Sequence, residues 1–284
     1  SFREFLETMR VPEGREITYS IFAKWVIRFP RQQRVSDAHR LYEEFRGVIT
    51  GSMIDKPWLS PEDYLNLGVR QSIYLNNERE LVYTLFEKYL AFLKENRYYD
   101  PNILAHNYLK HARQTYDFIV VDEVQDITNI QLQLILRSLK KTDHFILCGD
   151  SNQIVHPNFF SWSNVKSMLY NAESLEIQKV TRILVSNFRN STAVTDLANR
   201  ILRIKQKRFG SIDRESNYLM KSESENPGEI VFMRDTDRAK QELNQKTRRS
   251  TKFAVLVMRE EEKADARRFF DSPLLFSIKE AKGL

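Results

Sequence analysis

The sequence predicts an α/β protein with parallel strands, preceded by a mostly helical region. Two observations lead to this prediction. Apolar residues recur three and four positions apart through much of residues 1–115, and short β-branched runs alternate with amphipathic stretches from residue 116 onward. Strands that alternate with helices pair in parallel, because each helix carries the chain back across the sheet. We therefore expect a helical part followed by two α/β parts, over residues 116–177 and 178–284.

Residues 1–115 contain the clearest helical patterns. The apolar side chains of Glu80–Lys94 fall at helical spacings, and Leu41–Val48 and Pro61–Leu67 look similar. Ser60 stands where a helix cap is expected, with a proline and two acids directly after it. This order predicts the start of a helix, because serine caps free backbone amides and proline at the first position needs no amide partner.

Residues 116–177 begin with a strand, a helix and a second strand. Asp117–Val121 is an apolar, β-branched run, Asn129–Leu139 has one apolar face, and His144–Cys148 is another short apolar run. This rhythm is typical of a parallel sheet covered by helices.

Residues 178–284 predict a second α/β part. Its helix is expected at Ser191–Ile204, and the polar stretch Ser211–Pro227 reads as a loop. Four strands are expected in this part: Thr181–Val185, Glu229–Met233, Lys252–Met258 and Leu274–Ile278.

Composition excludes several classes of protein. Hydrophobic residues make up 42% of the 284 residues, which is enough for a packed core. Cys148 is the one cysteine, so an intramolecular disulfide is excluded, and the five histidines have no zinc-ligand spacing with it. The apolar runs are too short to cross a membrane. These features fit a cytoplasmic protein, and the net charge of +6 leans toward a polyanionic partner.

The first candidate site lies directly after the strand at Asp117–Val121. Asp122 and Glu123 stand past its carboxyl end, where α/β sheets bind ligands. In nucleotide hydrolysis one acid helps to hold Mg²⁺ and another orients or deprotonates water. The alternative is a pair of solvated acids, which many strand ends carry.

Two further segments extend this candidate site. Gly149-Asp150-Ser151-Asn152-Gln153 follows the next strand, and Gln153 could contact both a phosphate and the attacking water. Arg189 lies at a strand-to-helix junction of the second part, from which an arginine could stabilise charge on a transferring phosphoryl group. Alone, these segments would read as an ordinary turn and a surface arginine.

In this order, the three segments resemble motifs of the UvrD/Rep family of superfamily 1 helicases. The family's D-E-x-Q-D stretch is matched by Asp122, Glu123, Gln125 and Asp126. Its G-D-x-x-Q stretch is matched by Gly149, Asp150 and Gln153. Its N-Y/F-R-S/N stretch, followed by a helix with Ala-Asn, is matched by Asn187, Phe188, Arg189, Asn190, Ala198 and Asn199.

The resemblance implies a RecA-like P-loop NTPase helicase core with a helical insertion of the 1B type, and it implies ATP and Mg²⁺ as ligands. Asp122 would coordinate Mg²⁺ and Glu123 would activate water. Gln153 would sense the γ-phosphate, and Arg189 would reach it from the second domain. Gln125 would couple the site to the groove that binds the nucleic acid strand.

The resemblance also implies movement along single-stranded DNA, with RNA not excluded and protein partners left open. Thr18 lies in a segment similar to the family's T-F-H stretch near the strand, and Lys282 in one similar to the start of its S-x-K-G-L-E-F motif. Next to the Gln153 loop, aromatic rings could stack on bases. The candidates for this stacking are His156, Phe160 and Trp162, although such rings also fill protein cores.

The sequence departs from the family in one important respect. No G-x-x-x-x-G-K-S/T phosphate-binding loop occurs in it. The chain starts at Ser1 and stops at Lys282-Gly283-Leu284, so we expect a piece of a longer protein that hydrolyses no ATP by itself. The alternative is a catalytically inactive, helicase-like module that binds nucleic acid or regulates another protein.

Overall fold

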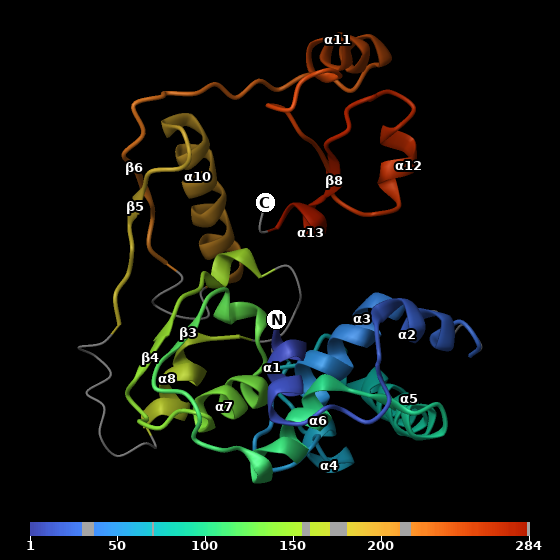
Figure 1. Ribbon diagram of the computed structural model, residues 1–284. Helices are drawn as coiled ribbons and strands as arrows, with labels where there is room; N and C mark the ends of the chain where they lie inside the picture. The colour runs from blue at the N-terminus through green and yellow to red at the C-terminus, as the bar shows by residue number, and fades with distance from the viewer. Residues whose placement is uncertain (30–36, 70, 155–159, 171–180, 211–216, 283–284) are drawn as a thin grey trace. The chain divides into compact units, whose positions relative to one another are not determined.

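A computed structural model describes residues 1–29, 37–69, 71–154, 160–170, 181–210 and 217–282 (Figure 1). The chain divides into two compact units. Unit 1 comprises Ser1–Leu184 with Lys205–Tyr218, and unit 2 comprises Val185–Ile204 with Leu219–Leu284. In the described part of the chain, no helix combines the length and apolar character needed to cross a membrane.

The first part of unit 1 is helical, as the sequence predicts. It contains α1 (Phe2–Met9), α2 (Tyr19–Val26), α3 (Ala38–Glu43), a π-helical segment (Glu44–Ile49), α4 (Pro61–Leu65), α5 (Asn76–Glu95), α6 (Pro101–Tyr108) and a 3₁₀ turn (Leu109–His111). Two short parallel strands, β1 (Arg15–Glu16) and β2 (Tyr98–Tyr99), pair within it.

The predicted helix start at Ser60 is confirmed. The Ser60 hydroxyl accepts a hydrogen bond from the backbone amide of Asp63 at 3.1 Å, and Pro61 is the first residue of α4. The predicted helix at Glu80–Lys94 lies inside α5. The predicted helix at Leu41–Val48 is divided between α3 and the π-helical segment.

Aromatic rings form the centre of the helical core. Phe22, Phe45, Phe86 and Tyr89 are all at most 1% exposed and come from α2, the π-helical segment and α5. The rings of Phe22 and Phe45 meet edge to face with centroids 5.6 Å apart, and those of Phe45 and Phe86 at 5.2 Å. Such pairs contribute about 0.5–1.5 kcal/mol each beyond the burial of their surface.

The carboxylate of Glu44, in the π-helical segment, is buried. It accepts hydrogen bonds from the Tyr64 hydroxyl at 2.7 Å, from the Ser72 hydroxyl, and from the backbone amide of Ile73 at 2.9 Å. Burial raises the pKa of Glu44 above its usual value, and these hydrogen bonds oppose the shift. The carboxylate is therefore satisfied by hydrogen bonds but desolvated.

The remainder of unit 1 is built on two parallel strands. These are β3 (Ile119–Val121) and β4 (Phe145–Leu147), joined by a 3₁₀ turn (Val124–Asp126) and α7 (Asn129–Arg137) and followed by a 3₁₀ turn (Ser151–Gln153) and α8 (Trp162–Tyr170). Figure 1 shows the two strands side by side with α7 and α8 nearby. Parallel pairing, with Val120 opposite Ile146, confirms the prediction.

One face of this sheet packs on helices. Val121 is 7% exposed and lies in a core with Leu132 and Ile135 of α7 and Val165 of α8. Val120 is 62% exposed, because successive strand residues point to opposite faces. One face of β3 is therefore buried against α7 and α8.

Unit 2 contains two further pairs of parallel strands. Its elements are β5 (Ser186–Asn187), α10 (Thr192–Phe209, which continues into unit 1), β6 (Lys221–Ser222), α11 (Asp237–Thr247), β7 (Val255–Val257), α12 (Glu262–Ala266), β8 (Leu275–Ser277) and α13 (Ile278–Ala281). β5 pairs with β6 and β7 with β8.

Two strands predicted for residues 178–284 are wrong. Thr181–Val185 and Glu229–Met233 form no strand, and Leu184 and Phe232 are 81% and 86% exposed. An apolar run becomes a strand only when a neighbour supplies the ladder of hydrogen bonds. The segment predicted as a loop at Ser211–Pro227 contains β6. The predicted strands at Lys252–Met258 and Leu274–Ile278 are confirmed as β7 and β8.

Candidate functional site

The predicted acids lie at one rim of the β3–β4 sheet. Asp122 and Glu123 directly follow β3, and Gly149 and Asp150 follow β4 closely. Because the two strands are parallel, their carboxyl ends meet at the same edge. Both acids are exposed at this edge, where a ligand can reach them.

Glu123 has a left-handed backbone conformation, with φ 53° and ψ 41°. A non-glycine residue in this region costs about 1–3 kcal/mol, and such strain gathers at functional sites. The backbone amide of Glu123 donates to the Asp122 carboxylate at 2.9 Å, and the amide of Val124 donates to the carbonyl of Cys148 at 2.9 Å. These bonds hold the left-handed turn against the sheet.

Gln125 connects the two loops at the rim. Its side chain is fully buried, donates to the Glu123 carboxylate and accepts from the backbone amide of Asp150 at 3.0 Å. One buried amide thus contacts the acid loop and the loop after β4. The resemblance implies that Gln125 couples the site to the groove that binds the nucleic acid strand, and this role stays a prediction.

Gly149 allows this close approach. A Cβ atom at Gly149 would lie 2.5 Å from Gln125 Oε1 and 2.8 Å from Val124 Cγ1, closer than real Cβ atoms come. The sequence predicts a glycine that permits a tight turn, but the contact with Gln125 has no signal in the sequence. Gly149 is thus a site residue for steric reasons.

Asp150 and Gln153 complete the rim. The Asp150 carboxylate accepts from the backbone amide of Asn152 at 2.8 Å and from the Gln153 side-chain amide at 3.1 Å. Gln153 is exposed. Glu123, Gln125, Asp150 and Gln153 therefore lie along one continuous path of hydrogen bonds, in which Asp150 contributes its backbone amide and its carboxylate.

Arg189 lies in unit 2, between β5 and α10. The Asn187 side-chain carbonyl accepts hydrogen bonds from the backbone amides of Arg189 at 3.0 Å and Asn190 at 2.9 Å, which is an Asx turn. The Arg189 side chain is exposed. The turn therefore fixes the backbone of Arg189 and leaves its guanidinium group in solvent.

The predicted nucleic-acid contacts have different surroundings. Thr18 caps α2, with its hydroxyl 3.5 Å from the amide of Ile21. Trp162 begins α8 and is half-buried, with its ring 5.3 Å from that of Phe160. Phe160 is 4% exposed and belongs to the core, so its expected stacking on bases is corrected: a ring enclosed by protein cannot take a base on its face. His156 lies outside the described residues.

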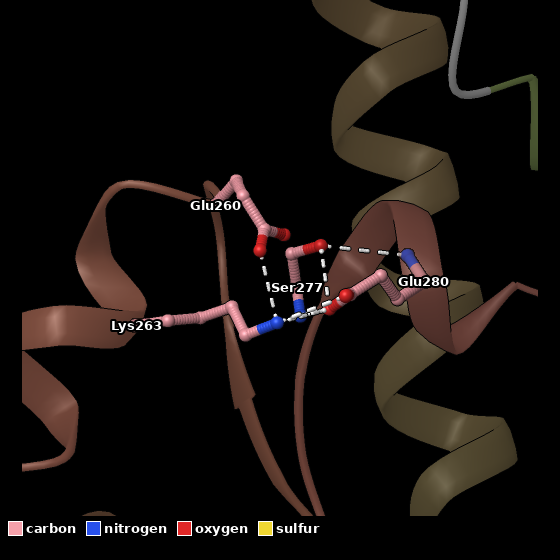
Figure 2. Close-up of polar contacts among 4 residues, drawn as sticks. All are labelled: Glu260, Lys263, Ser277 and Glu280. Carbon is pink, nitrogen blue, oxygen red and sulfur yellow. Dashed lines mark hydrogen bonds and ion pairs between the residues drawn. The ribbon is translucent and has the colours of Figure 1, made fainter.

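Ion pairs between side chains hold the segment that leads to Lys282 (Figure 2). Lys263 of α12 contacts the Glu280 carboxylate and Glu260, each at 2.9 Å. The Glu280 carboxylate also accepts from the backbone amide of Ser277 at 2.9 Å, which caps α13. The hydrogen bond from Lys263 lowers the pKa of Glu280. Lys282 directly follows α13, and Gly283 and Leu284 lie outside the described residues.

The rim suits a magnesium ion that is shared with a ligand. Among the described residues, no group of three or more His, Cys, Asp or Glu side chains could hold a metal ion. Mg²⁺, however, is commonly bound by one or two carboxylates together with phosphate oxygens and water. The exposed Asp122 fits this mode, since its second oxygen is available beside the one that accepts from Glu123.

The rim lies in a region of the sequence that is similar to a known protein family. Residues 55–174 match the UvrD/REP helicase N-terminal domain. The matched region includes α4, α5 and α6 as well as both strands at the rim. The motifs that contain Asp122, Gln153 and Arg189 all follow the helical part, whereas the matched region starts within it. The similarity to this family domain therefore extends over the helical part from residue 55 onward as well as over the acids.

Two curated proteins are also similar. A human protein named TPR and ankyrin repeat-containing protein 1 is 22% identical over 221 residues, which is 70% of this chain and 8% of that protein. A probable DNA helicase II homolog of Mycoplasma capricolum is 27% identical over 96 residues, which is 34% of this chain and 13% of that protein. The chain thus spans a small part of the length of both relatives.

Proposed function

We propose that the chain, whose residues 55–174 match the UvrD/REP helicase N-terminal domain, is part of a motor that couples ATP hydrolysis to movement along single-stranded DNA. One observation carries the proposal. Gln125 connects the acid after β3 to the loop after β4, at the rim where a nucleotide would bind.

In this proposal, each residue at the rim has one task. Glu123 orients the attacking water and accepts its proton. Gln153 contacts the γ-phosphate. Gln125 holds the loop after β3 and the loop after β4 in fixed positions through its two hydrogen bonds. Asp122 would hold Mg²⁺, which, when bound, neutralises charge on the phosphate oxygens.

Residues outside the rim would supply the remaining chemistry. Arg189 would stabilise charge on the transferring phosphoryl group. Trp162 would stack on bases, and Thr18 and Lys282 would contact the nucleic acid strand. A phosphate-binding loop is not among the 284 residues, so we propose that the natural full-length protein supplies it elsewhere.

The test uses the natural full-length protein with the substitution Glu123→Gln. We expect the strand-stimulated ATPase rate to fall at least about 10²-fold, the lower range for loss of a general base, with the nucleotide Kd unchanged. The control is Glu87→Gln, which alters an exposed acid on α5. Normal turnover by Glu123→Gln, or a wild-type protein that hydrolyses no ATP in the presence of single-stranded DNA, would refute the proposal.

A further inference from the structure

A buried network around Asn102 joins the helical part of unit 1 to the segment that follows the acids. Asn102 is fully buried in the first turn of α6. Its amide group donates to the carbonyl of Arg46 at 2.7 Å and to Thr50 Oγ1 at 3.0 Å. Its side-chain carbonyl accepts from Thr128 Oγ1 and Gln131 Nε2, both at 2.8 Å. Both donors and both acceptor positions of the side chain are in use.

Thr128 indicates that this network serves more than the stability of α7. Thr128 directly precedes α7, where a threonine hydroxyl ordinarily accepts a hydrogen bond from a free amide of the helix. The Thr128 hydroxyl makes no such bond and donates to Asn102 instead. A local cap is thus replaced by a contact between segments 26 residues apart.

The turn at Gly51 is fitted closely to the same place. A Cβ atom at Gly51 would lie 2.8 Å from Thr128 Cγ2 and 2.3 Å from the carbonyl oxygen of Arg46. The Asn129 side-chain amide donates to the carbonyl of Ser52 at 3.3 Å. The end of the π-helical segment is therefore fastened to the start of α7 by side chains and by close backbone contact.

A short, closed turn connects Thr128 to the acids. The backbone amide of Asp126 donates to the carbonyl of Glu123 at 2.9 Å, and the amide of Ile127 donates to that of Val124 at 3.1 Å. Thr128 follows directly. A displacement of Thr128 would therefore be passed to Glu123 through hydrogen-bonded backbone rather than absorbed by a flexible loop.

We propose that Asn102 is a positioning residue for ATP hydrolysis: it holds the start of α7 against the helical part and thereby fixes the backbone of Glu123. The inference rests on the proposed function, because Glu123 is assigned there as the base. The competing explanation is that the network stabilises the helical part alone. The two explanations differ in what happens at residues 122–128 when Asn102 loses its bonds.

The test compares four variants of the natural full-length protein. Asn102→Leu removes all four side-chain bonds at similar volume, and Thr128→Val removes one of them with little change of shape. Thr128→Ser keeps the hydroxyl. The matched control is Tyr83→Phe, which removes a buried hydrogen bond of 2.8 Å to the carbonyl of Leu59 within the helical part. Amide hydrogen exchange at residues 122–128, the ATPase kcat and the nucleotide Kd are measured for each.

We expect Thr128→Val to speed amide exchange at residues 122–128 about tenfold and to lower kcat about tenfold, as the loss of one buried hydrogen bond would do. Asn102→Leu, which loses four such bonds, should have at least as large an effect on both. The nucleotide Kd should stay unchanged, and Thr128→Ser and Tyr83→Phe should behave like the wild type. The proposal is overturned if amide exchange at residues 122–128 changes no more in Thr128→Val than in Tyr83→Phe. It is also overturned if exchange becomes faster in Thr128→Val while kcat stays normal.

The exchange measurement also separates this inference from the proposed function. A wild-type protein without ATPase activity would remove the proposed function and, with it, the catalytic use of the network. Faster exchange at residues 122–128 in Thr128→Val would still support the mechanical link from Asn102 to Glu123. Thr128→Val serves if Asn102→Leu fails to fold, because it leaves three of the four bonds of Asn102 in place.

Discussion

The side-chain carbonyl of Gln125 accepts a hydrogen bond from the backbone amide of Asp150 at 3.0 Å, across 25 residues of sequence. The same side chain donates to Glu123. A glutamine can do both because its amide carries a donor and an acceptor on one flat group. The position of the proposed base is therefore tied to the loop that carries Gln153.

Replacing Gln125 with methionine tests this tie. The methionine fills the same space but removes the part-buried hydrogen bond from the amide of Asp150, so we expect a loss of about 0.5–1.5 kcal/mol in the free energy of unfolding. We also expect kcat for ATP in the full-length protein to fall about tenfold or more, since a misplaced base is a weaker one. Denaturant titration and steady-state ATPase assays measure the two effects. Full activity together with reduced stability would mean that the bridge is only structural.

The backbone of Glu123 leads to a second prediction. Glycine adopts left-handed angles without strain, whereas alanine does not, so Glu123→Gly should be more stable than Glu123→Ala by about 1 kcal/mol. Both variants should lack ATPase activity. At Glu87, in the middle of α5, the order should reverse, because glycine is about 1 kcal/mol worse than alanine inside a helix. Equal stability of the two Glu123 variants would argue against a left-handed residue there.

Parts of this arrangement could be predicted from the sequence. The pairing of β3 with β4 follows from apolar runs on either side of an amphipathic helix, and the helix start at Ser60 follows from capping chemistry. These features depend on neighbours in sequence. Similarity to a family then placed Glu123 and Gln153 in one site.

Other parts depend on contacts that a local pattern does not contain. The predicted helix at Leu41–Val48 turns π-helical, with the Thr50 amide bonded to the carbonyl of Phe45, five residues earlier, at 2.9 Å. The run Thr181–Val185 has strand-like residues, but the described strand starts only at Ser186, where β6 pairs. Asn102 carries no motif, and its role becomes visible only when Thr128 is found beside it.

The proposed stacking surface gives a third prediction. Trp162→Ala should weaken binding of single-stranded DNA by about 10- to 100-fold, because stacking of a base on an aromatic ring contributes about 1–3 kcal/mol. The loss should be the same at two salt concentrations, since stacking releases no counterions. Phe160→Leu, which alters the buried neighbouring ring, is the control. Fluorescence anisotropy with a labelled oligonucleotide measures both, and an unchanged Kd for Trp162→Ala would remove this residue from the binding surface.

The buried carboxylate of Glu44 gives the fourth prediction, a pH dependence of stability. Burial raises the pKa of Glu44 above 4.5, so between pH 4.5 and the folded-state pKa the folded chain holds a proton that the unfolded chain releases. The free energy of unfolding must then fall as pH rises through this window, by at most about 1.4 kcal/mol per pH unit for one group. The pKa of the buried Asp100 is raised for the same reason and adds to the slope.

Glu44→Gln isolates the contribution of Glu44. The amide cannot ionise and keeps a carbonyl oxygen for the hydroxyls of Tyr64 and Ser72, although it loses the acceptor for the amide of Ile73. We expect its stability to decline less steeply with pH than that of the wild type, with the remaining slope due to Asp100. Denaturant titrations from pH 4.5 to 7.5 measure this, with the exposed Glu87→Gln as a control that keeps the full slope. Identical slopes in Glu44→Gln and the wild type would mean that Glu44 titrates like a solvated acid, so that the hydrogen bonds to its carboxylate offset the whole cost of burial.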